Sequence, residues 1–456
     1  TILGAAKIVG RTQGGTSFGI IEAVTAREYA QIEVDGDRRD YLIEPLTNYF
    51  VGRLNQDVLE GNSRVGLITT AVNRQNSNAA YVGGLDWDLR FAKERYRVNG
   101  TLAASQAGKL DARKSGYLAR FEFSKHGGWL TGDTSLRMLS PNFEMNDLGF
   151  RRRGNLLVWK QGLRARKEKS FNVFRRATFG FLGWWPWNYD GVNIGSYVEL
   201  LTFGQFKNYW DYNLRIGRVL PSFSDDDIQR GGALIKNPPG WWSYMRLSTD
   251  SRKMLQFRLS SALGWKDDRQ SYEYNVRFLI RIRPASNIEL SLGPLYSYNV
   301  NNAQWIKQVE ENLSGHTKKH YVYGRLISRT LDFTTRADIS FTPTLTLQFY
   351  LQPFIAVGDY TDFKELIEPK SYQFKPYPLN ENRDFHRRSL RGNTVLRWEF
   401  RPGSTLFLVW SQSREAALAS VTASDLEFRP LRRLRSSFTD EGKNIFLIKC
   451  RYWFGV

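Results

Sequence analysis

Long runs of alternating apolar and polar residues limit most strongly what this chain can fold into. In residues 81–91, YVGGLDWDLRF, the aromatic and leucine side chains fall on odd numbers and the charged ones on even numbers. Successive side chains of a β-strand point to opposite faces, so this segment predicts a strand with one apolar and one charged face. Residues 96–104, 272–283 and 288–299 repeat the pattern.

The predicted strands are long, and their connections alternate between tight and long. Globular strands have about 5–6 residues, whereas a strand that crosses a bilayer needs about 9–11. Short turns on one side and long loops on the other are typical of a bacterial outer-membrane barrel. Tight turns are predicted near residues 13–15, 60–62, 93–94, 126–128, 167–169, 207–208, 251–253, 284–287, 342–344 and 401–403. Long connections are predicted around residues 28–45, 140–150, 222–240, 301–320, 359–390 and 415–441.

These patterns predict an all-β fold, a transmembrane antiparallel outer-membrane β-barrel. Counting the alternating segments gives about 21 strands, and because such barrels usually have an even number, the intact barrel should have roughly 22. Residues 1–456 are expected to form this single barrel domain, with one further strand preceding Thr1. The expected location is the bacterial outer membrane, among its lipid and lipopolysaccharide.

Composition agrees with a barrel and excludes some alternatives. No run of 18 apolar residues exists, which excludes a transmembrane helix. A mean hydropathy of −0.45 is compatible with a barrel, in which only every second strand residue faces lipid. The single cysteine, Cys450, excludes an intrachain disulfide. The net charge of +20 comes without a recognisable nucleic-acid-binding fold, so no nucleic-acid partner is expected.

Several segments resemble one bacterial envelope family of unknown function. They are AAKIVGRT at 5–12, EPLTNYFVGRL at 44–54, GNS at 61–63, TAVNR at 70–74, GGLDWD at 83–88 and FTPTL at 341–345. The family joins an N-terminal domain similar to carbohydrate-binding family 9 to a C-terminal outer-membrane barrel. The resemblance implies that this upstream domain precedes Thr1, and it supplies no catalytic residues.

Two sets of residues are candidates for the lining and the rim of the barrel. The expected basic lining of the lumen is Arg90, Arg97, Arg120, Arg258, Arg277, Arg281, Arg283, Arg397, Lys449 and Arg451. The expected aromatic girdle at the membrane interface is Trp184, Trp185, Trp187, Trp241 and Trp242. A sugar-stacking platform is the alternative for these tryptophans.

No catalytic, cofactor or metal site is predicted. The histidines His126, His316, His320 and His386 fall in predicted turns or loops, where solvated side chains are expected, and no nucleophilic triad or set of zinc ligands surrounds them. The acidic residues Asp86, Asp88 and Glu122 could resemble a glycosidase pair. They are expected instead to pair with neighbouring arginines, since charges left alone in a lumen wall are costly. The arginines concerned are Arg90, Arg95, Arg97 and Arg120.

Three functions are compatible with these sequence features. The first is a membrane anchor or scaffold for the upstream sugar-binding-like domain or a protein partner. The alternative is a plugged or gated channel or transporter for anionic or saccharide-like solutes, because rings of Arg and Lys favour anions. An outer-membrane enzyme is the third and has no supporting constellation. A barrel this wide needs a plug, for which the connection at 359–390 is the main candidate within the chain.

Overall fold

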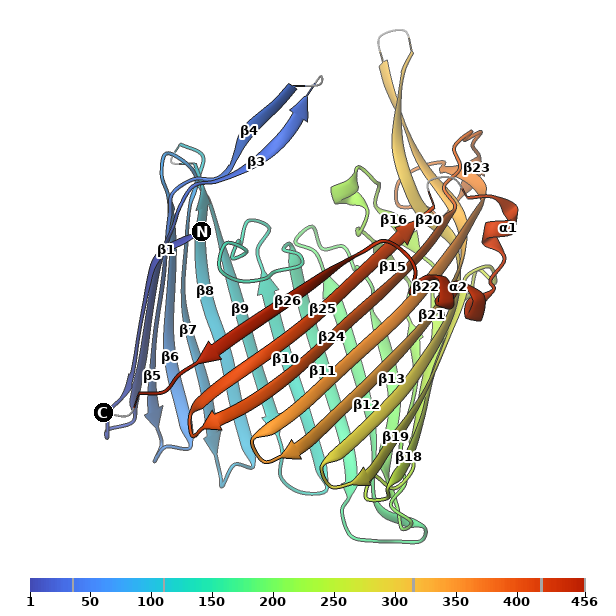
Figure 1. Cartoon of the computed structure of the whole chain (residues 1–456). Helices are drawn as coiled ribbons and strands as arrows, with labels where there is room; N and C mark the ends of the chain where they lie inside the picture. The colour runs from blue at the N-terminus through green and yellow to red at the C-terminus, as the bar shows by residue number, and fades with distance from the viewer. Residues whose placement is uncertain (35–36, 110, 314–315, 419–420, 455–456) are drawn as a thin grey trace. The chain divides into compact units, whose positions relative to one another are not determined.

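The computed structural model describes the whole chain except residues 35–36, 110, 314–315, 419–420 and 455–456 (Figure 1). The chain divides into two compact units. Unit 1 comprises Thr1–Arg166 and Gly180–Tyr197, and unit 2 comprises Lys167–Phe179 and Val198–Val456. No helix in the described part of the chain is long and apolar enough to cross a membrane.

Unit 1 is built almost entirely from strands that pair with their neighbours in sequence. Its strands are β1 (Ile2–Arg11), β2 (Thr16–Thr25), β3 (Glu28–Val34), β4 (Asp37–Glu44), β5 (Thr47–Val58), β6 (Ser63–Arg74), β7 (Ala79–Phe91), β8 (Tyr96–Gly108), β9 (Lys114–Lys125), β10 (Leu130–Leu139) and, up to its last residue, β11 (Leu156–Lys167). The strand β12 (Phe174–Trp187) is divided between the two units. The short strands β3 and β4 form a separate hairpin.

Unit 2 has the same plan, and it contains the three longest strands, β20, β21 and β22. Its strands are β13 (Tyr197–Phe206), β14 (Asp211–Val219), β15 (Ser222–Ser224), β16 (Ile235–Asn237), β17 (Gly240–Ser248), β18 (Leu255–Lys266), β19 (Tyr272–Ala285), β20 (Ile288–Leu313), β21 (His316–Thr342), β22 (Leu345–Leu366), β23 (Phe374–Pro376), β24 (Phe385–Arg401), β25 (Ser404–Ala417) and β26 (Gly442–Arg451). Three short helices lie in its connections: η1 (Ile228–Arg230), α1 (Ala423–Leu426) and α2 (Pro430–Ser436).

The structure confirms the all-β prediction. All strands except β3, β4, β15 and β16 belong to one antiparallel sheet of 22 strands. One of the 22 is the three-residue β23, which pairs with the end of β22, so 21 strands of nine residues or more remain. The strand pairings leave β1 and β26 as the edges, so the sheet is not closed in the described structure.

All ten predicted tight turns connect consecutive strands, as expected. The predicted long connections are partly wrong, because several of them contain regular structure. Residues 301–320 are mostly strand: β20 continues to Leu313 and β21 starts at His316, and this hairpin extends beyond its neighbours within unit 2 (Figure 1). The β-forming residues Trp305 and Tyr323 are buried there against loop segments, which lets strand pairing continue.

Each unit's sheet has one apolar and one polar face. In unit 2 the strand register places the apolar side chains in common cross-strand rows, and we call these residues the apolar face of unit 2: Leu214, Ile216, Met245, Leu259, Leu263, Trp265, Val276, Phe278 and Ile280. The opposite side chains form the polar face of unit 2: Asn213, Arg215, Trp242, Tyr244, Arg246, Ser248, Arg258, Ser260, Glu273, Asn275, Arg277 and Arg281.

Candidate functional site

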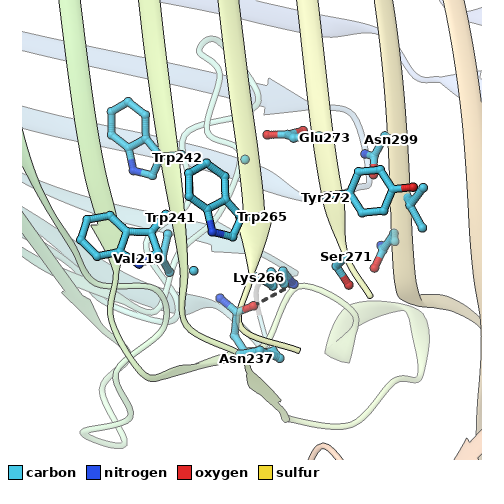
Figure 2. A pocket seen from close by; sticks show the side chains of 15 residues that line it. Val219, Asn237, Trp241, Trp242, Trp265, Lys266, Ser271, Tyr272, Glu273 and Asn299 are labelled. Atoms are coloured by element: carbon cyan, nitrogen blue, oxygen red, sulfur yellow. Dashed lines mark hydrogen bonds between the residues drawn. The ribbon is translucent and has the colours of Figure 1, made fainter. Parts of the chain in front are cut away.

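A cavity of about 360 Å³ lies at the end of the polar face of unit 2 where β17 begins and β18 ends. Figure 2 shows three tryptophan side chains at the ends of neighbouring strands, with aromatic and polar residues on the strands beyond them. The tryptophans are Trp241, Trp242 and Trp265, and we call the cavity the tryptophan pocket. Trp242 lies on the polar face, whereas Trp241 and Trp265 share a cross-strand row with Tyr272 on the apolar side. Tyr272, Glu273 and Asn299 add a phenol, a carboxylate and an amide to its lining.

Trp242 owes its position to a glycine on a neighbouring strand. The register sets it opposite Gly217 on β14 and Gly264 on β18. A Cβ atom at Gly217 would lie 2.3 Å from Cε2 and Nε1 of Trp242, so the indole lies across Gly217 and a side chain there would displace it. The same row continues through Glu273 and Asn299. An aromatic surface thus lies beside hydrogen-bonding side chains, as in many ligand sites.

Two hydrogen-bonded groups hold the rim of the tryptophan pocket. Lys266 Nζ donates to Asn237 Oδ1 at 3.1 Å, as the dashed line in Figure 2 marks. The Asp268 carboxylate accepts hydrogen bonds from the backbone and hydroxyl of Ser271 at 2.9 and 2.7 Å, and from the Tyr372 hydroxyl at 3.0 Å. Burial would raise the pKa of Asp268, but these hydrogen bonds outweigh it and lower the pKa.

A second cavity, of about 450 Å³, lies nearer the turns between β13 and β14 and between β17 and β18, and we call it the arginine pocket. Four arginines line it together with two acids: Arg176, Arg246, Arg258 and Arg281, with Glu168 and Asp211. Polar residues that are almost fully buried, Ser248 and Gln256, form part of its wall.

A third cavity of about 440 Å³ connects the other two. It shares Trp242 and Glu273 with the tryptophan pocket, and Asn213 and Arg246 with the arginine pocket. The three cavities therefore follow one another along the polar face of unit 2, from the loop end of the strands to the tight-turn end.

The arginines of this pocket have few acidic partners. Arg258 Nε donates to Ser248 Oγ at 3.1 Å, and Arg281 Nε lies 3.0 Å from Glu289 Oε1. Among the residues that the structure describes, neither Arg176 nor Arg246 has a salt bridge or a side-chain hydrogen bond. An arginine-lined cavity with spare donors is suited to an anionic group, because the guanidinium fork matches carboxylate and phosphate oxygens.

On the polar face of unit 1 several arginines are paired with carboxylates, although Arg137, opposite Arg120, has no acidic partner among the described residues. Arg53 forms two hydrogen bonds with Asp86 at 2.5 and 2.9 Å, and Arg97 forms two with Asp88 at 2.7 and 2.8 Å. Arg120 pairs with Glu122 at 2.7 Å. The predicted pairing of these carboxylates with arginines is confirmed. Arg53 was not among the predicted partners, because it is 33 positions from Asp86 and meets it only through the strand register.

One known family matches the whole chain. The model of a domain of unknown function, DUF5916, matches residues 1–456. The chain belongs to the DUF5916 family. The match agrees with the resemblance to a family of unknown function and says nothing of a carbohydrate-binding domain. No curated protein matches the chain.

Other predicted lining residues of this DUF5916 chain also lie beside acids or at an edge. Arg90 lies 3.6 Å from Asp88, Arg283 lies 2.6 Å from Glu289, and Arg397 lies 2.7 Å from Glu399. Lys449 and Arg451 are exposed on the edge strand β26. Arg277 is exposed on the polar face of unit 2. Whether these residues line a lumen stays a prediction.

The five predicted girdle tryptophans do not share one face, because consecutive residues of a strand point in opposite directions. Trp184 packs beside the buried cluster of Leu139, Leu156 and Val158, whereas Trp185 stacks on Trp159 with 4.6 Å between ring centroids. Trp187 forms an isolated bridge with Asn193. Trp241 and Trp242 alternate in the same way along β17. A single girdle cannot therefore contain all five.

Two histidines of this DUF5916 chain contradict the prediction of solvated loop side chains. His320 is buried within β21, where Nδ1 contacts Glu365 and Nε2 lies 3.1 Å from Glu311. His386 is buried within β24. Both were placed in loops because the strands run further than the sequence suggested. His126 does lie in a turn, 3.0 Å from the Ser124 hydroxyl, and the side chain of His316 lies outside the described residues.

The described residues contain no group of three or more His, Cys, Asp or Glu side chains that could hold a metal ion.

Proposed function

We propose that this chain forms a closed β-barrel in the bacterial outer membrane and that its interior passes anionic, saccharide-like solutes. The observation that supports this proposal most directly is that each long strand has one apolar and one polar face. Phe179, Leu163 and Leu263 are about half exposed on the apolar side of their strands. Exposed apolar surface of this extent marks an interaction site, and hydrocarbon is the partner that suits alternating strands of nine or more residues.

Closure of the proposed barrel requires more than the pairings described. With 21 long antiparallel strands, β1 and β26 run in the same direction. One additional strand that paired antiparallel with both β1 and β26 would close the barrel. The number of strands would then be even, as in single-chain bacterial barrels. The edges are exposed and apolar, with Ile8 and Phe446 among their residues, and such edges need a partner. The strand expected before Thr1 stays a prediction.

The row of cavities supports the passage of solutes. On the polar face the tryptophan pocket offers the Trp242 ring with the Glu273 carboxylate and the Asn299 amide, which suit a sugar ring and its hydroxyls. The arginine pocket offers unpaired guanidinium groups, which suit carboxylate or phosphate. A solute with both features, an acidic oligosaccharide, fits the order of groups along the polar face.

Planar-bilayer recording of the purified protein tests this proposal. Heat-dependent electrophoretic mobility first shows whether a barrel has formed. We expect single channels that are more permeable to chloride than to potassium. An acidic oligosaccharide should block these channels at a lower concentration than its neutral counterpart does. A folded barrel without conductance, or with cation selectivity, would contradict the proposed passage.

A membrane anchor for a protein partner is the second candidate. The observation that favours it is the hairpin of β20 and β21, whose strands have 26 and 27 residues. A crossing strand needs about 9–11 residues, so much of this hairpin extends beyond any bilayer. A folded, non-conducting barrel that retains a partner through this hairpin would favour the anchor.

A further inference from the structure

The connection between β25 and β26 carries a basic helical segment that packs on the outward side of unit 2. Leu434 of α2 is buried against Ile355 and Val357 of β22, with Leu331 packed beside them. Phe428 lies 5.7 Å from Tyr296, measured between ring centroids. We call residues 423–438 the basic segment.

The residues beneath the basic segment belong to the apolar side of the sheet. The register places Val276, Tyr296, Leu331 and Ile355 in one cross-strand row. Val276 is part of the apolar face of unit 2, which the proposed function turns toward lipid. The basic segment therefore lies on the lipid side of the wall, and the inference rests on the proposed function in this respect.

Strand geometry gives the height of this contact. Leu331 is 11 residues from Thr342, where β21 ends at the tight turn. At about 3.3 Å per residue this is roughly 36 Å along the strand, and with a tilt of about 45° it is roughly 25 Å of height. The apolar band of an outer-membrane barrel is also about 25 Å tall. The basic segment thus covers the level at which hydrocarbon ends and lipid headgroups begin.

The segment presents arginines at this level. It contains Arg429, Arg432, Arg433 and Arg435 within seven residues. Arg433 is paired with Asp425 at 3.3 Å, and Arg429 with Glu427 at 2.5 Å. Arg432 and Arg435 are exposed, and neither guanidinium has a polar partner among the residues described.

Other charged groups around the segment leave these two arginines available. The acids Asp425 and Glu427 are engaged with Arg433 and Arg429, and Asp440 accepts hydrogen bonds from Arg388 at 2.6 and 2.8 Å. Arg329, on the same side of the sheet, lies over the ring of Tyr298 at 5.6 Å. The exposed charge at this level is therefore mainly positive.

We propose that the basic segment binds the phosphate groups of phosphorylated glycolipid in the leaflet on the loop side of the membrane. Arg432 and Arg435 supply the guanidinium forks, which match phosphate oxygens in geometry and charge. The buried Leu434 between them anchors α2 on the wall, so the forks face outward at headgroup height.

Native mass spectrometry of the detergent-solubilised full chain tests the proposal. The probe is diphosphoryl lipid A, compared with the same lipid after removal of its phosphates. We expect the phosphorylated form to bind and the double variant Arg432→Gln with Arg435→Gln to weaken it roughly 10- to 30-fold, as loss of two arginines near an anionic surface implies. Lys207→Gln with Lys253→Gln, an equal charge change at the tight-turn end, is the control and should bind as the wild type does.

The outcomes separate this proposal from the proposed function. Equal binding by the double variant, equal binding of the dephosphorylated lipid, or full competition by inorganic phosphate at the same molar concentration would overturn the lipid site while leaving a folded, membrane-inserted barrel intact. A chain that never enters a bilayer would overturn both. Because Arg432 and Arg435 are exposed, the heat-dependent mobility of the double variant should equal that of the wild type.

Discussion

The polar faces of the two units differ in how some of their arginines are paired. In unit 1 the guanidinium groups of Arg53, Arg97 and Arg120 each meet a carboxylate. In unit 2, Arg246 and Arg258 line a cavity without a salt bridge to any described residue. Paired charges form a fixed wall, whereas unpaired ones keep their hydrogen-bonding capacity for a ligand. The net charge of the chain hides this difference, since the partners and not the number of arginines distinguish the two faces.

The largest expected effect concerns the apolar faces, where the two units should behave alike. Leu136→Arg in unit 1 and Phe278→Arg in unit 2 should each destabilise the folded barrel by about 2–4 kcal/mol, because arginine at a lipid-facing midplane position is costly. Urea unfolding in lipid vesicles measures the loss. Asn275→Arg, on the polar face of the strand that carries Phe278, is the matched control and should cost much less. Equal losses at Asn275 and Phe278 would mean that the faces are assigned wrongly.

On the polar faces, loss of a charged side chain should destabilise unit 1 more than unit 2. Asp88→Asn leaves Arg97 and Arg90 without their carboxylate and should cost about 1–2 kcal/mol, at the low end for charged hydrogen bonds because the pair is partly exposed. Arg246→Gln removes no salt bridge and should change the free energy of unfolding by less than about 0.5 kcal/mol. Urea titrations of the two variants make the comparison. A larger loss for Arg246→Gln would show that it has a structural partner.

Ion selectivity should also distinguish the two units, but here the substitutions in unit 2 should have the larger effect. Arg246→Gln with Arg258→Gln removes two positive charges from the arginine pocket and should lower the anion-to-cation permeability ratio several-fold. In unit 1, Arg97→Gln with Asp88→Asn removes a neutral pair and should leave the ratio unchanged. Reversal potentials in a salt gradient measure both. Equal shifts in the two double variants would remove the functional distinction between the faces.

The sequence alone could predict what depends on local order. Alternation along β7 and β19 and the ten tight turns required only period-two patterning and turn position. The extension of β20 and β21 was missed because Trp305 and Tyr323 are buried by segments distant in the chain, among them Ala233 and Leu366.

The candidate site was less predictable, because it depends on register between strands. The sequence shows Trp242 as an aromatic residue, but the position of its ring depends on Gly217, which lies opposite it on β14. Arg258 and Arg281 were predicted to line a lumen, whereas the buried Ser248 and Gln256 that share their cavity gave no sign in the sequence. A glycine flanked by bulky residues on a charged strand, such as Gly217 between Ile216 and Arg218, is the signal that could have indicated a close approach.

The smallest expected effect is a difference in pH response between the loop ends of the two units. In unit 1, Glu44 accepts hydrogen bonds from Arg74 and Thr47 at 2.7 and 3.1 Å, and although burial raises its pKa, these partners lower it overall. A lowered pKa gives stability that is present above the unfolded value of about 4.3 and lost as the pH falls further. In unit 2, burial and the charge of Asp268 raise the pKa of Tyr372. A raised pKa gives stability that is present below about pH 10 and lost above the folded value.

Acid should therefore loosen the connection around Glu44 first, and alkali the connection around Tyr372. Limited proteolysis of the folded protein, with proteases active at each extreme of pH, locates the cuts. Glu44→Gln should remove most of the acid response, and Tyr372→Phe most of the alkaline one, because each substitution removes the titrating group and keeps the shape. Should both connections open at the same pH, or should each variant titrate as the wild type does, these two groups do not hold the loops.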